Sequence, residues 1–374
     1  MRRPLHVILD VTARCNLKCV MCYFSETDRL HFSPAEAPTP PDGNMSLAVF
    51  ERIAAELFPR ARRVALGCAA EPMIHPRFRE ILDVAGRYGI PDLWFPTNLL
   101  PLSEPTAESL IRNRVSTVAA SIDGTTGETY EKIRVPARFE QILTKLELLR
   151  EVKKRNRTDR PRLRIIFTWM KSNRGELASL PAFAEEHGAR ELDVRYVAPT
   201  IGVDVTGELL SGEDPARLNA ELASAARDAV RRGLRLVSYP DFESGQPRPR
   251  DFFSRVRRRL WRIRAGIDRR EHLRYMWKQK RNGCAYPLDY YVVRPNGAVA
   301  PCIYWDREPI GLFPAQSLAE ISRGDSLARI LDGLRSGVPH GTCASCRERR
   351  DALYAPRTAR TAESPKAKRR LFRA

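Results

Sequence analysis

Three cysteines within eight residues constrain this chain more than any other feature of its sequence. Cys15, Cys19 and Cys22 have the spacing C-x3-C-x2-C and follow a short apolar run over residues 5–11. A structural zinc site takes four ligands, usually in two pairs, and a fully ligated iron–sulfur cubane also takes four cysteines. No fourth Cys or His lies at zinc spacing beside these three. The spacing therefore favours a cubane with one iron left open to bind a small molecule.

The length and composition of the chain are those of a globular protein. Its 374 residues are 43% hydrophobic and 29% charged, which is ordinary for a soluble protein and sufficient for a large core. No apolar run approaches the length of about eighteen residues that a transmembrane helix needs. The basic start over residues 1–4 leads directly into a predicted strand rather than a signal peptide, which predicts a cytoplasmic protein. Eight cysteines are too sparse for a disulfide scaffold and favour metal binding in a reducing compartment.

The net charge of +19 comes mainly from two segments. Residues 248–282 hold fourteen Arg or Lys against three Asp or Glu, and residues 357–374 hold seven against one. The rest of the chain is therefore nearly neutral. Apolar residues recur at helical spacing in the first segment and predict a basic amphipathic helix: Phe252, Phe253, Val256, Leu260, Ile263 and Ile267. This helix could cover an anionic substrate, lie peripherally on an anionic membrane surface, bind RNA, or only join two modules.

Six predicted strands alternate with predicted helices in the first half of the chain. The strands cover residues 5–11, 63–67, 92–96, 117–122, 163–169 and 191–197. The helices cover residues 47–57, 78–88, 107–113, 138–156 and 176–187. Ser46 is a suitable N-cap for the first helix. Such alternation is typical of a parallel α/β sheet, and right-handed crossovers curl it into a barrel or a partial barrel.

Polar residues follow several of these strands at the ends that a parallel sheet brings together. The cysteine loop follows the first strand, Glu71 the second and Asn98 the third, while Ser121 and Asp123 lie at the end of the fourth. Functional residues of barrel enzymes lie where strands end and loops begin. The positions therefore support a site beside the cysteines, independently of the cysteine spacing. Arg195, near the end of the sixth strand, could face the same cavity.

A second group of cysteines lies nearer the C-terminus: Cys284, Cys302, Cys343 and Cys346. The segment between the first two predicts a β-hairpin, because Asn296-Gly297 stands between β-rich arms. A helix is predicted over residues 326–336. The four cysteines could ligate an iron–sulfur cluster or a structural zinc ion. Cys68 is left over, and we expect it to be a small buried residue.

The cysteine loop, residues 67–72 and residues 120–134 together resemble the radical S-adenosylmethionine (radical SAM) enzymes, and the resemblance extends over roughly residues 5–350. It implies that Cys15, Cys19 and Cys22 hold three irons of a [4Fe–4S] cluster. The fourth iron would then bind S-adenosylmethionine (SAM), and one electron would split a C–S bond to give a 5′-deoxyadenosyl radical.

The same resemblance implies a set of cofactor-binding residues. Glu71 would accept a hydrogen bond from the amino group of SAM, and Ser121 would contact its ribose or carboxylate. Asp123 would orient that group. Met21 replaces an aromatic residue that is usual in the family and could pack on the adenine. Asn98 is a further candidate at its strand end.

The second group of cysteines resembles the SPASM auxiliary-cluster domain in its shortened "twitch" form, because no cysteine follows Cys346. The resemblance implies an auxiliary [4Fe–4S] cluster with four cysteine ligands, which suits electron transfer. We therefore expect an α/β fold: a partial (β/α)6 TIM-like radical SAM barrel, a linker with the basic helix, a small α+β twitch/SPASM-like module and a basic disordered tail. Their expected bounds are 1–200, 201–282, 283–350 and 351–374.

The function expected from this resemblance is hydrogen abstraction from a carbohydrate-like, nucleoside-like or peptide substrate that could be anionic. The outcome could be oxidation, epimerisation or bond formation, with electrons from an external flavodoxin- or ferredoxin-type donor. Two alternatives remain at this point. The first is a radical SAM enzyme that modifies RNA through residues 248–282. The second is a zinc-stabilised, basic nucleic-acid-binding protein without catalysis.

Overall fold

The computed structural model describes residues 5–22, 40–197 and 203–238 and most of residues 284–346. In that last range it describes 284, 286–287, 290–303, 305, 308–339, 341–344 and 346. The predicted basic helix in residues 248–282 and the predicted tail lie outside the described residues. No helix in the described part of the chain is long and apolar enough to cross a membrane.

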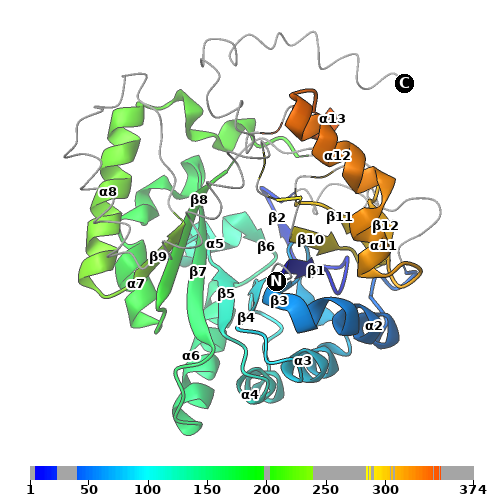
Figure 1. The fold of residues 1–374 in the computed structure, drawn as a ribbon. Helices are drawn as coiled ribbons and strands as arrows, with labels where there is room; N and C mark the ends of the chain where they lie inside the picture. Colours follow the sequence, from blue (N-terminus) through cyan, green and yellow to red (C-terminus); the bar gives the residue numbers. More distant parts are fainter. Residues whose placement is uncertain are drawn as a thin grey trace.

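The six predicted strands form one parallel, curled sheet in chain order (Figure 1). They are β1 (Leu5–Leu9), β3 (Ala61–Leu66), β4 (Asp92–Thr97), β5 (Thr117–Ser121), β7 (Arg162–Trp169) and β8 (Glu191–Tyr196). A further strand, β9 (Arg235–Ser238), pairs in parallel with β8 at one edge. Because the carboxyl ends of all these strands meet at one edge, the loops that follow them are brought together.

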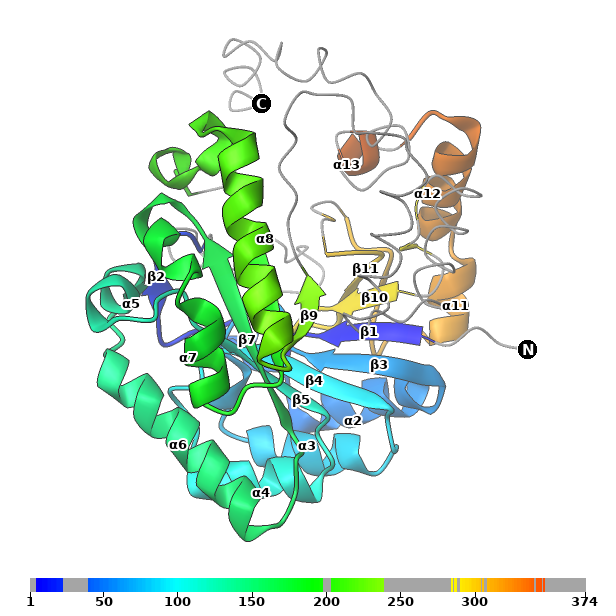
Figure 2. The same ribbon diagram turned by 90° about the vertical axis from the view of Figure 1, so that its left-hand side faces the viewer.

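Helices cover the outer face of the curled sheet, as Figures 1 and 2 show for α2, α3, α4, α6 and α7. The helices in the described residues are α2 (Leu47–Leu57), α3 (Phe78–Gly86), α4 (Glu104–Arg112), α5 (Gly127–Ile133), α6 (Phe139–Arg155), α7 (Leu180–Glu186), α8 (Pro215–Arg231), α11 (Leu318–Arg323), α12 (Asp325–Ser336) and α13 (Gly341–Ala344). Short 3-10 turns are η1 (Phe58–Arg60), η2 (Pro72–Ile74), η3 (Lys171–Leu177), η4 (Thr206–Glu208) and η5 (Leu210–Gly212). The predicted partial (β/α)6 barrel is confirmed.

The helix boundaries follow local capping chemistry. Ser46 caps α2 as predicted, with its hydroxyl accepting from the backbone N–H of Val49. The predicted helix over 107–113 begins earlier, because Ser103 caps it and a proline fits its first turn. The predicted helix over 176–187 begins later, at Leu180. Pro181 lacks an N–H and is tolerated only in a first turn, so the residues before it form η3 instead.

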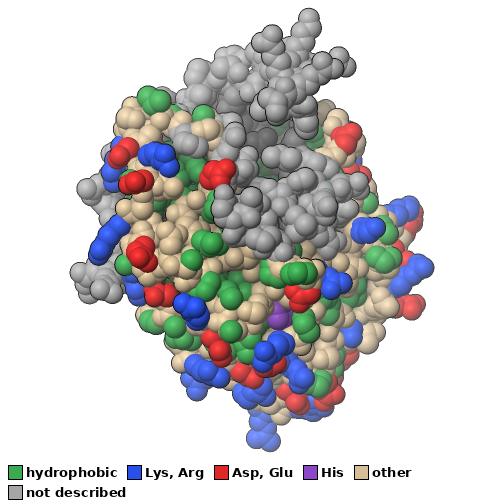
Figure 3. All heavy atoms as spheres, turned by 90° about the vertical axis from the view of Figure 1, so that its right-hand side faces the viewer, with side chains coloured by type: hydrophobic (Ala, Val, Ile, Leu, Met, Phe, Trp, Pro, Cys, Tyr) green, Lys and Arg blue, Asp and Glu red, His purple; other side chains and the backbone are tan. Residues whose placement is uncertain are grey.

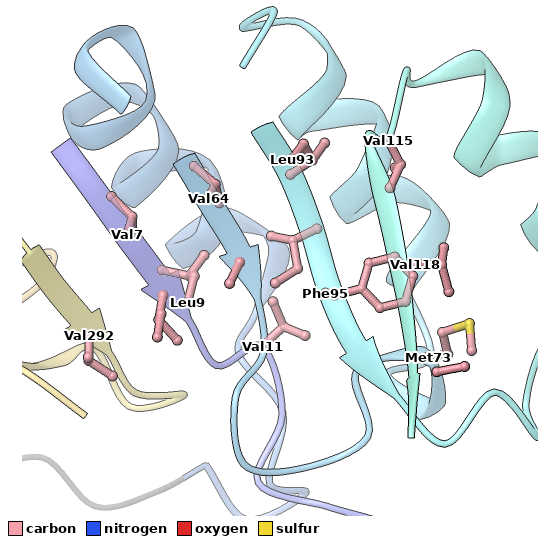
Figure 4. Packing of buried hydrophobic residues seen from close by; sticks show 14 of the residues in the cluster. Val7, Leu9, Val11, Val64, Met73, Leu93, Phe95, Val115, Val118 and Val292 are labelled. Carbon is pink, nitrogen blue, oxygen red and sulfur yellow. The ribbon is translucent and has the colours of Figure 1, made fainter. Parts of the chain in front are cut away.

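Buried aliphatic and aromatic side chains join the strands to the helices (Figure 4). Val7, Val64 and Phe95 come from three neighbouring strands, and each is at most 1% exposed. A buried side chain of this size contributes about 1.5–3 kcal/mol. Successive side chains of a strand point to opposite faces of the sheet. The strand residues between those that pack against the helices therefore point into the barrel.

The second cysteine group belongs to a module whose hairpin extends the barrel sheet. The module's strands are β10 (Tyr290–Val293), β11 (Ala298–Ala300) and β12 (Gly311–Leu312). As predicted, β10 and β11 are antiparallel around Asn296-Gly297. The sequence did not reveal that β10 also pairs in parallel with β1. Arg294, just after β10, donates to Asp10 at 2.7 Å and ties the module to the end of β1.

A two-stranded antiparallel sheet fixes the cysteine loop. It consists of β2 (Lys18–Cys19) and β6 (Arg134–Val135), with Cys19 opposite Arg134. The N–H of Val20 also donates to the carbonyl of Ile133 at 3.0 Å. The loop is therefore held against the segment that follows α5.

Basic and acidic side chains are mixed over the face of the protein that Figure 3 shows. This pattern agrees with the nearly neutral charge of the chain outside its two basic segments.

Candidate functional site

A cavity of about 350 Å³ lies at the carboxyl ends of the parallel strands. Seven of the predicted site residues line it: Cys15, Cys19, Met21, Cys22, Glu71, Asn98 and Ser121. Thr97 and Thr168 add two hydroxyls to the same wall. The cavity therefore combines three thiols with acceptors and donors from four different strand ends.

Glu71 is buried at this site and its carboxylate is held by three donors. It accepts from the N–H of Met73 at 3.1 Å, the hydroxyl of Thr97 at 2.8 Å and the N–H of Asn98 at 2.6 Å. Burial raises the pKa of Glu71 to about 7, and these hydrogen bonds partly offset the shift. The N–H of Glu71 donates to the carbonyl of Arg14 at 3.0 Å, which ties the end of β3 to the cysteine loop.

Asn98 connects the end of β4 to the same loop. Its amide nitrogen donates to the side-chain oxygen of Asn16 at 2.7 Å and lies 4.0 Å from the sulfur of Cys15. The N–H of Leu17 also points to that sulfur, at 3.5 Å. Asn98 therefore positions the first cysteine as well as lining the cavity.

Asp123 lies behind the cavity wall rather than among the residues that line it. It is fully buried, and one carboxylate oxygen accepts from Nε of Arg134 at 2.7 Å. The other accepts from the N–H of Thr168 at 2.6 Å. Arg134 lines the cavity in front of it, with Nη1 3.8 Å from the sulfur of Cys19. Burial raises the pKa of Cys19, and the charge of Arg134 opposes that shift.

Arg134 is a site residue that sequence reasoning missed. It follows α5 and pairs with Cys19 through two-residue strands, and such short strands leave no periodic pattern. The one signal in the sequence was that Arg134 is the last residue of segment 120–134, which resembles the radical SAM enzymes.

The end of β8 contributes exposed side chains to the cavity wall. Arg195 lines it, as its strand-end position predicted, and its guanidinium is paired with Asp193 at 2.6 Å. Tyr196 beside it is 44% exposed. Both side chains are therefore open to a molecule that enters the cavity.

Cys68 also lines the cavity and is exposed there, so the expectation that it is a buried residue is wrong. Its backbone N–H donates to Asp10 at 2.7 Å, and this turn after β3 leaves its side chain exposed at the cavity.

The cysteine loop contributes three thiols to the cavity, and thiols are the donors of iron–sulfur clusters. Around one zinc ion, bonds of about 2.3 Å bring three sulfurs within about 4 Å of one another. Within the residues that the structure describes, no group of three or more His, Cys, Asp or Glu side chains is arranged to hold a metal ion. The three thiols nevertheless face one cavity, as a larger iron–sulfur cluster requires.

The second cysteine group is distributed over one module. Cys284 is buried before β10, Cys302 follows β11, Cys343 lies in α13 and Cys346 follows it. Cys302 and Cys343 pack partly against the main core. Among the described residues, these four cysteines are not gathered into a group that could hold a metal ion.

Comparisons with known proteins agree with both cysteine groups. The Radical SAM superfamily model matches residues 9–161, and an iron–sulfur cluster-binding domain (SPASM) matches residues 284–347. The AdoMet-dependent heme synthase of Methanosarcina barkeri is 27% identical over 210 residues, or 55% of this chain and 54% of that protein. Mycofactocin maturase MftC of Mycobacterium ulcerans is 27% identical over 206 residues, or 55% and 51%. The chain thus spans about half the length of these curated relatives.

Solved structures show a related fold. SuiB of Streptococcus suis aligns with a TM-score of 0.62 and 16% identity, over 89% of this chain and 68% of SuiB. SuiB has also been solved with S-adenosylmethionine and with its precursor peptide SuiA. At this identity the comparison supports the fold, namely the barrel with its C-terminal module.

Proposed function

Since the chain belongs to the radical SAM superfamily and carries a SPASM iron–sulfur domain, we propose that it cleaves SAM reductively and abstracts a hydrogen atom from a peptide. Domains of these two types bind [4Fe–4S] clusters, and the first type also binds SAM. The observation that carries the proposal is the convergence of three thiols, Glu71 and Ser121 on one cavity.

The residues of the cysteine loop would hold the first cluster. Cys15, Cys19 and Cys22 supply three ligands, which leaves one position for SAM. When bound, this cluster supplies the electron that splits a C–S bond of SAM and gives the 5′-deoxyadenosyl radical. Asn98 and the N–H of Leu17 keep Cys15 in place through their contacts with its sulfur.

Other wall residues would bind and orient SAM. Glu71 has one carboxylate oxygen that accepts a single backbone hydrogen bond, so it can accept another from an amino group. Ser121 and Thr168 offer hydroxyls to the ribose or the carboxylate. Met21 and Val197 supply apolar surface for the adenine. In this assignment Asp123 acts through Arg134, which it holds in position.

Cys284, Cys302, Cys343 and Cys346 would hold one auxiliary cluster. A cluster with four protein ligands has no open iron and suits electron transfer. The pairing of β10 with β1 supports this role, because it joins the auxiliary module to the strand that carries the cysteine loop. Electrons would arrive from an external donor of the flavodoxin or ferredoxin type.

Two of the proteins that resemble this chain support a peptide as the substrate class. MftC is described as a maturase, and SuiB has been solved with a precursor peptide. The exposed side chains of Tyr196 and of Arg195, which is paired with Asp193, give the cavity wall an aromatic ring and guanidinium donors for a peptide backbone. The reaction would be an oxidation, an epimerisation or a bond formation on that peptide.

Deuterium transfer can test the substrate class before the substrate itself is identified. The reconstituted enzyme is given a lysate of its source organism grown in deuterated medium, with SAM and a low-potential reductant. We expect deuterium in the released 5′-deoxyadenosine, and we expect it to disappear when the lysate is first digested with protease. Deuterium transfer that survives digestion would contradict a peptide substrate. Glu71→Ala serves as the control, because it lacks the carboxylate that would accept a hydrogen bond from the amino group of SAM.

A further inference from the structure

We propose that Arg134 raises the reduction potential of the cluster in the cysteine loop by placing a fixed positive charge against the sulfur of Cys19. The inference rests on the proposed function, because it requires a cluster on Cys15, Cys19 and Cys22. It assigns Arg134 a positioning and electrostatic role rather than a contact with substrate.

The position of Arg134 is fixed from two sides. In the backbone, β6 pairs with β2 so that Arg134 lies directly opposite Cys19. In the side chain, Nε and Nη2 bind one oxygen of Asp123 at 2.7 and 2.5 Å. The guanidinium is only 10% exposed, and Asp123 is fully buried. The group therefore cannot swing away from the loop without breaking a buried ion pair.

The orientation of the guanidinium sets the sign of the effect. Its Nε and Nη2 face Asp123, whereas Nη1 faces the sulfur of Cys19 at 3.8 Å. The cationic group thus lies between the carboxylate and the thiol, so its positive charge is nearer to the cluster site. The charge of an arginine is present at every working pH.

The contacts of Cys15 provide a contrast within the same loop. Its sulfur is approached by the backbone N–H of Leu17 and the amide of Asn98, which are both neutral donors. Arg134 adds a full charge at Cys19. In an interior of low effective dielectric, a charge acts more strongly than it would in water.

The consequence for the cluster follows from charge balance. Reduction adds one electron from an external low-potential donor, and no bond or proton need change. The cluster becomes more negative by one charge, so a nearby cation stabilises the reduced form more than the oxidised form. Hydrogen bonds to the sulfurs and local charge are established determinants of such potentials. Arg134 would therefore make the first cluster easier to reduce.

The test is a potentiometric titration of the full-length, cluster-loaded enzyme followed by electron paramagnetic resonance. The first cluster is identified as the signal that changes when SAM is added. We expect Arg134→Gln to lower its equilibrium constant for reduction at least tenfold, which is about 59 mV for a one-electron couple. Arg134→Lys keeps the charge, and we expect a smaller shift from it.

Arg164→Gln is the matched control. Arg164 is also buried, at 7% exposure, and is paired with Glu191. It precedes the cavity residue Thr168 by four positions, about 13 Å along β7. We expect the potential to stay within threefold of wild type in this variant. An equal shift in the two glutamine variants would overturn the inference, because the effect would then not depend on contact with the loop.

A further variant covers the case in which Arg134→Gln does not retain iron. Asp123→Asn/Arg134→Gln removes both charges, so no carboxylate is left buried without its partner. By the same charge balance, we expect the double variant to show a lowered potential but a smaller shift than Arg134→Gln, because loss of the more distant negative charge partly offsets loss of the positive one. A wild-type potential in Arg134→Gln or in the double variant, or an equal shift in Arg134→Lys and Arg134→Gln, would overturn the role of the charge. If the wild-type protein gave no SAM-responsive cluster signal, the proposed function itself would fail, which is a distinct result.

Discussion

Replacement of Gly297 by alanine is expected to destabilise the auxiliary module more than the same replacement at Gly337. Both glycines have positive φ, +84° and +80°, which L-residues rarely adopt. They differ in their surroundings. A Cβ on Gly297 would lie 1.9 Å from the carbonyl oxygen of Phe313, whereas a Cβ on Gly337 would meet no atom within 4 Å.

The magnitude can be worked from these two environments. The left-handed conformation costs alanine about 1–2 kcal/mol at either position. At Gly297 the backbone of Phe313 must also retreat, since real Cβ atoms essentially never come within 3.0 Å of another atom. Overpacking of this kind costs about 1–3 kcal/mol more. We therefore expect a loss of about 2–5 kcal/mol for Gly297→Ala and about 1–2 kcal/mol for Gly337→Ala.

The assay combines urea unfolding, followed by circular dichroism, with iron per chain in the anaerobically reconstituted protein. Gly297 precedes Cys302 by five residues, so a displaced turn should also disturb the auxiliary cluster. We expect iron to fall from about eight toward about four atoms per chain in Gly297→Ala and to stay near eight in Gly337→Ala. Equal destabilisation of the two variants, with equal iron content, would show that the carbonyl of Phe313 does not restrict the side chain at position 297.

Two further predictions concern buried carboxylates. Glu191 is 1% exposed and pairs with Arg164, so we expect Glu191→Gln to lower the free energy of unfolding by about 3–5 kcal/mol, as measured by urea unfolding. Glu128→Gln breaks an exposed pair with Lys132 and should leave that free energy unchanged; an equal loss in both variants would contradict the role of burial. Burial raises the pKa of Glu71 from 4.5 to about 7, so the stability contributed by its neutral form is full below pH 4.5 and is lost as pH rises through about 7. We therefore expect the melting temperature of the metal-free wild-type protein to fall relative to that of Glu71→Gln as pH rises from 4.5 to about 7. A difference in melting temperature that does not vary with pH would count against the raised pKa.

Much of the fold was predictable because it depends on local patterns. The six strands, the Ser46 cap and the Asn296-Gly297 hairpin each follow from residues close together in the sequence. Parallel strand ends then brought Glu71 and Asn98 to the cysteine loop, since that geometry is general for such sheets.

The remaining features depend on contacts between distant segments. The pairing of β2 with β6 joins residues more than one hundred positions apart through strands of two residues, which carry no periodic signal. The pairing of β10 with β1 is similar, because an alternating pattern predicts a strand but not its partner. Arg134 could not be placed beside Cys19 until the first of these pairings was known.

Iron content and SAM cleavage, measured together, test the central claim most directly. We expect the anaerobically reconstituted protein to hold about eight irons, the content of two cubanes, and to release 5′-deoxyadenosine under reductant. Cys15→Ala should hold about four irons and release no 5′-deoxyadenosine. Cys302→Ala should also lose about four irons but should still release 5′-deoxyadenosine. Cys68→Ala, a cysteine variant in the same cavity, should keep about eight. Release of 5′-deoxyadenosine by Cys15→Ala, or zinc in place of iron in the wild-type protein, would contradict the account.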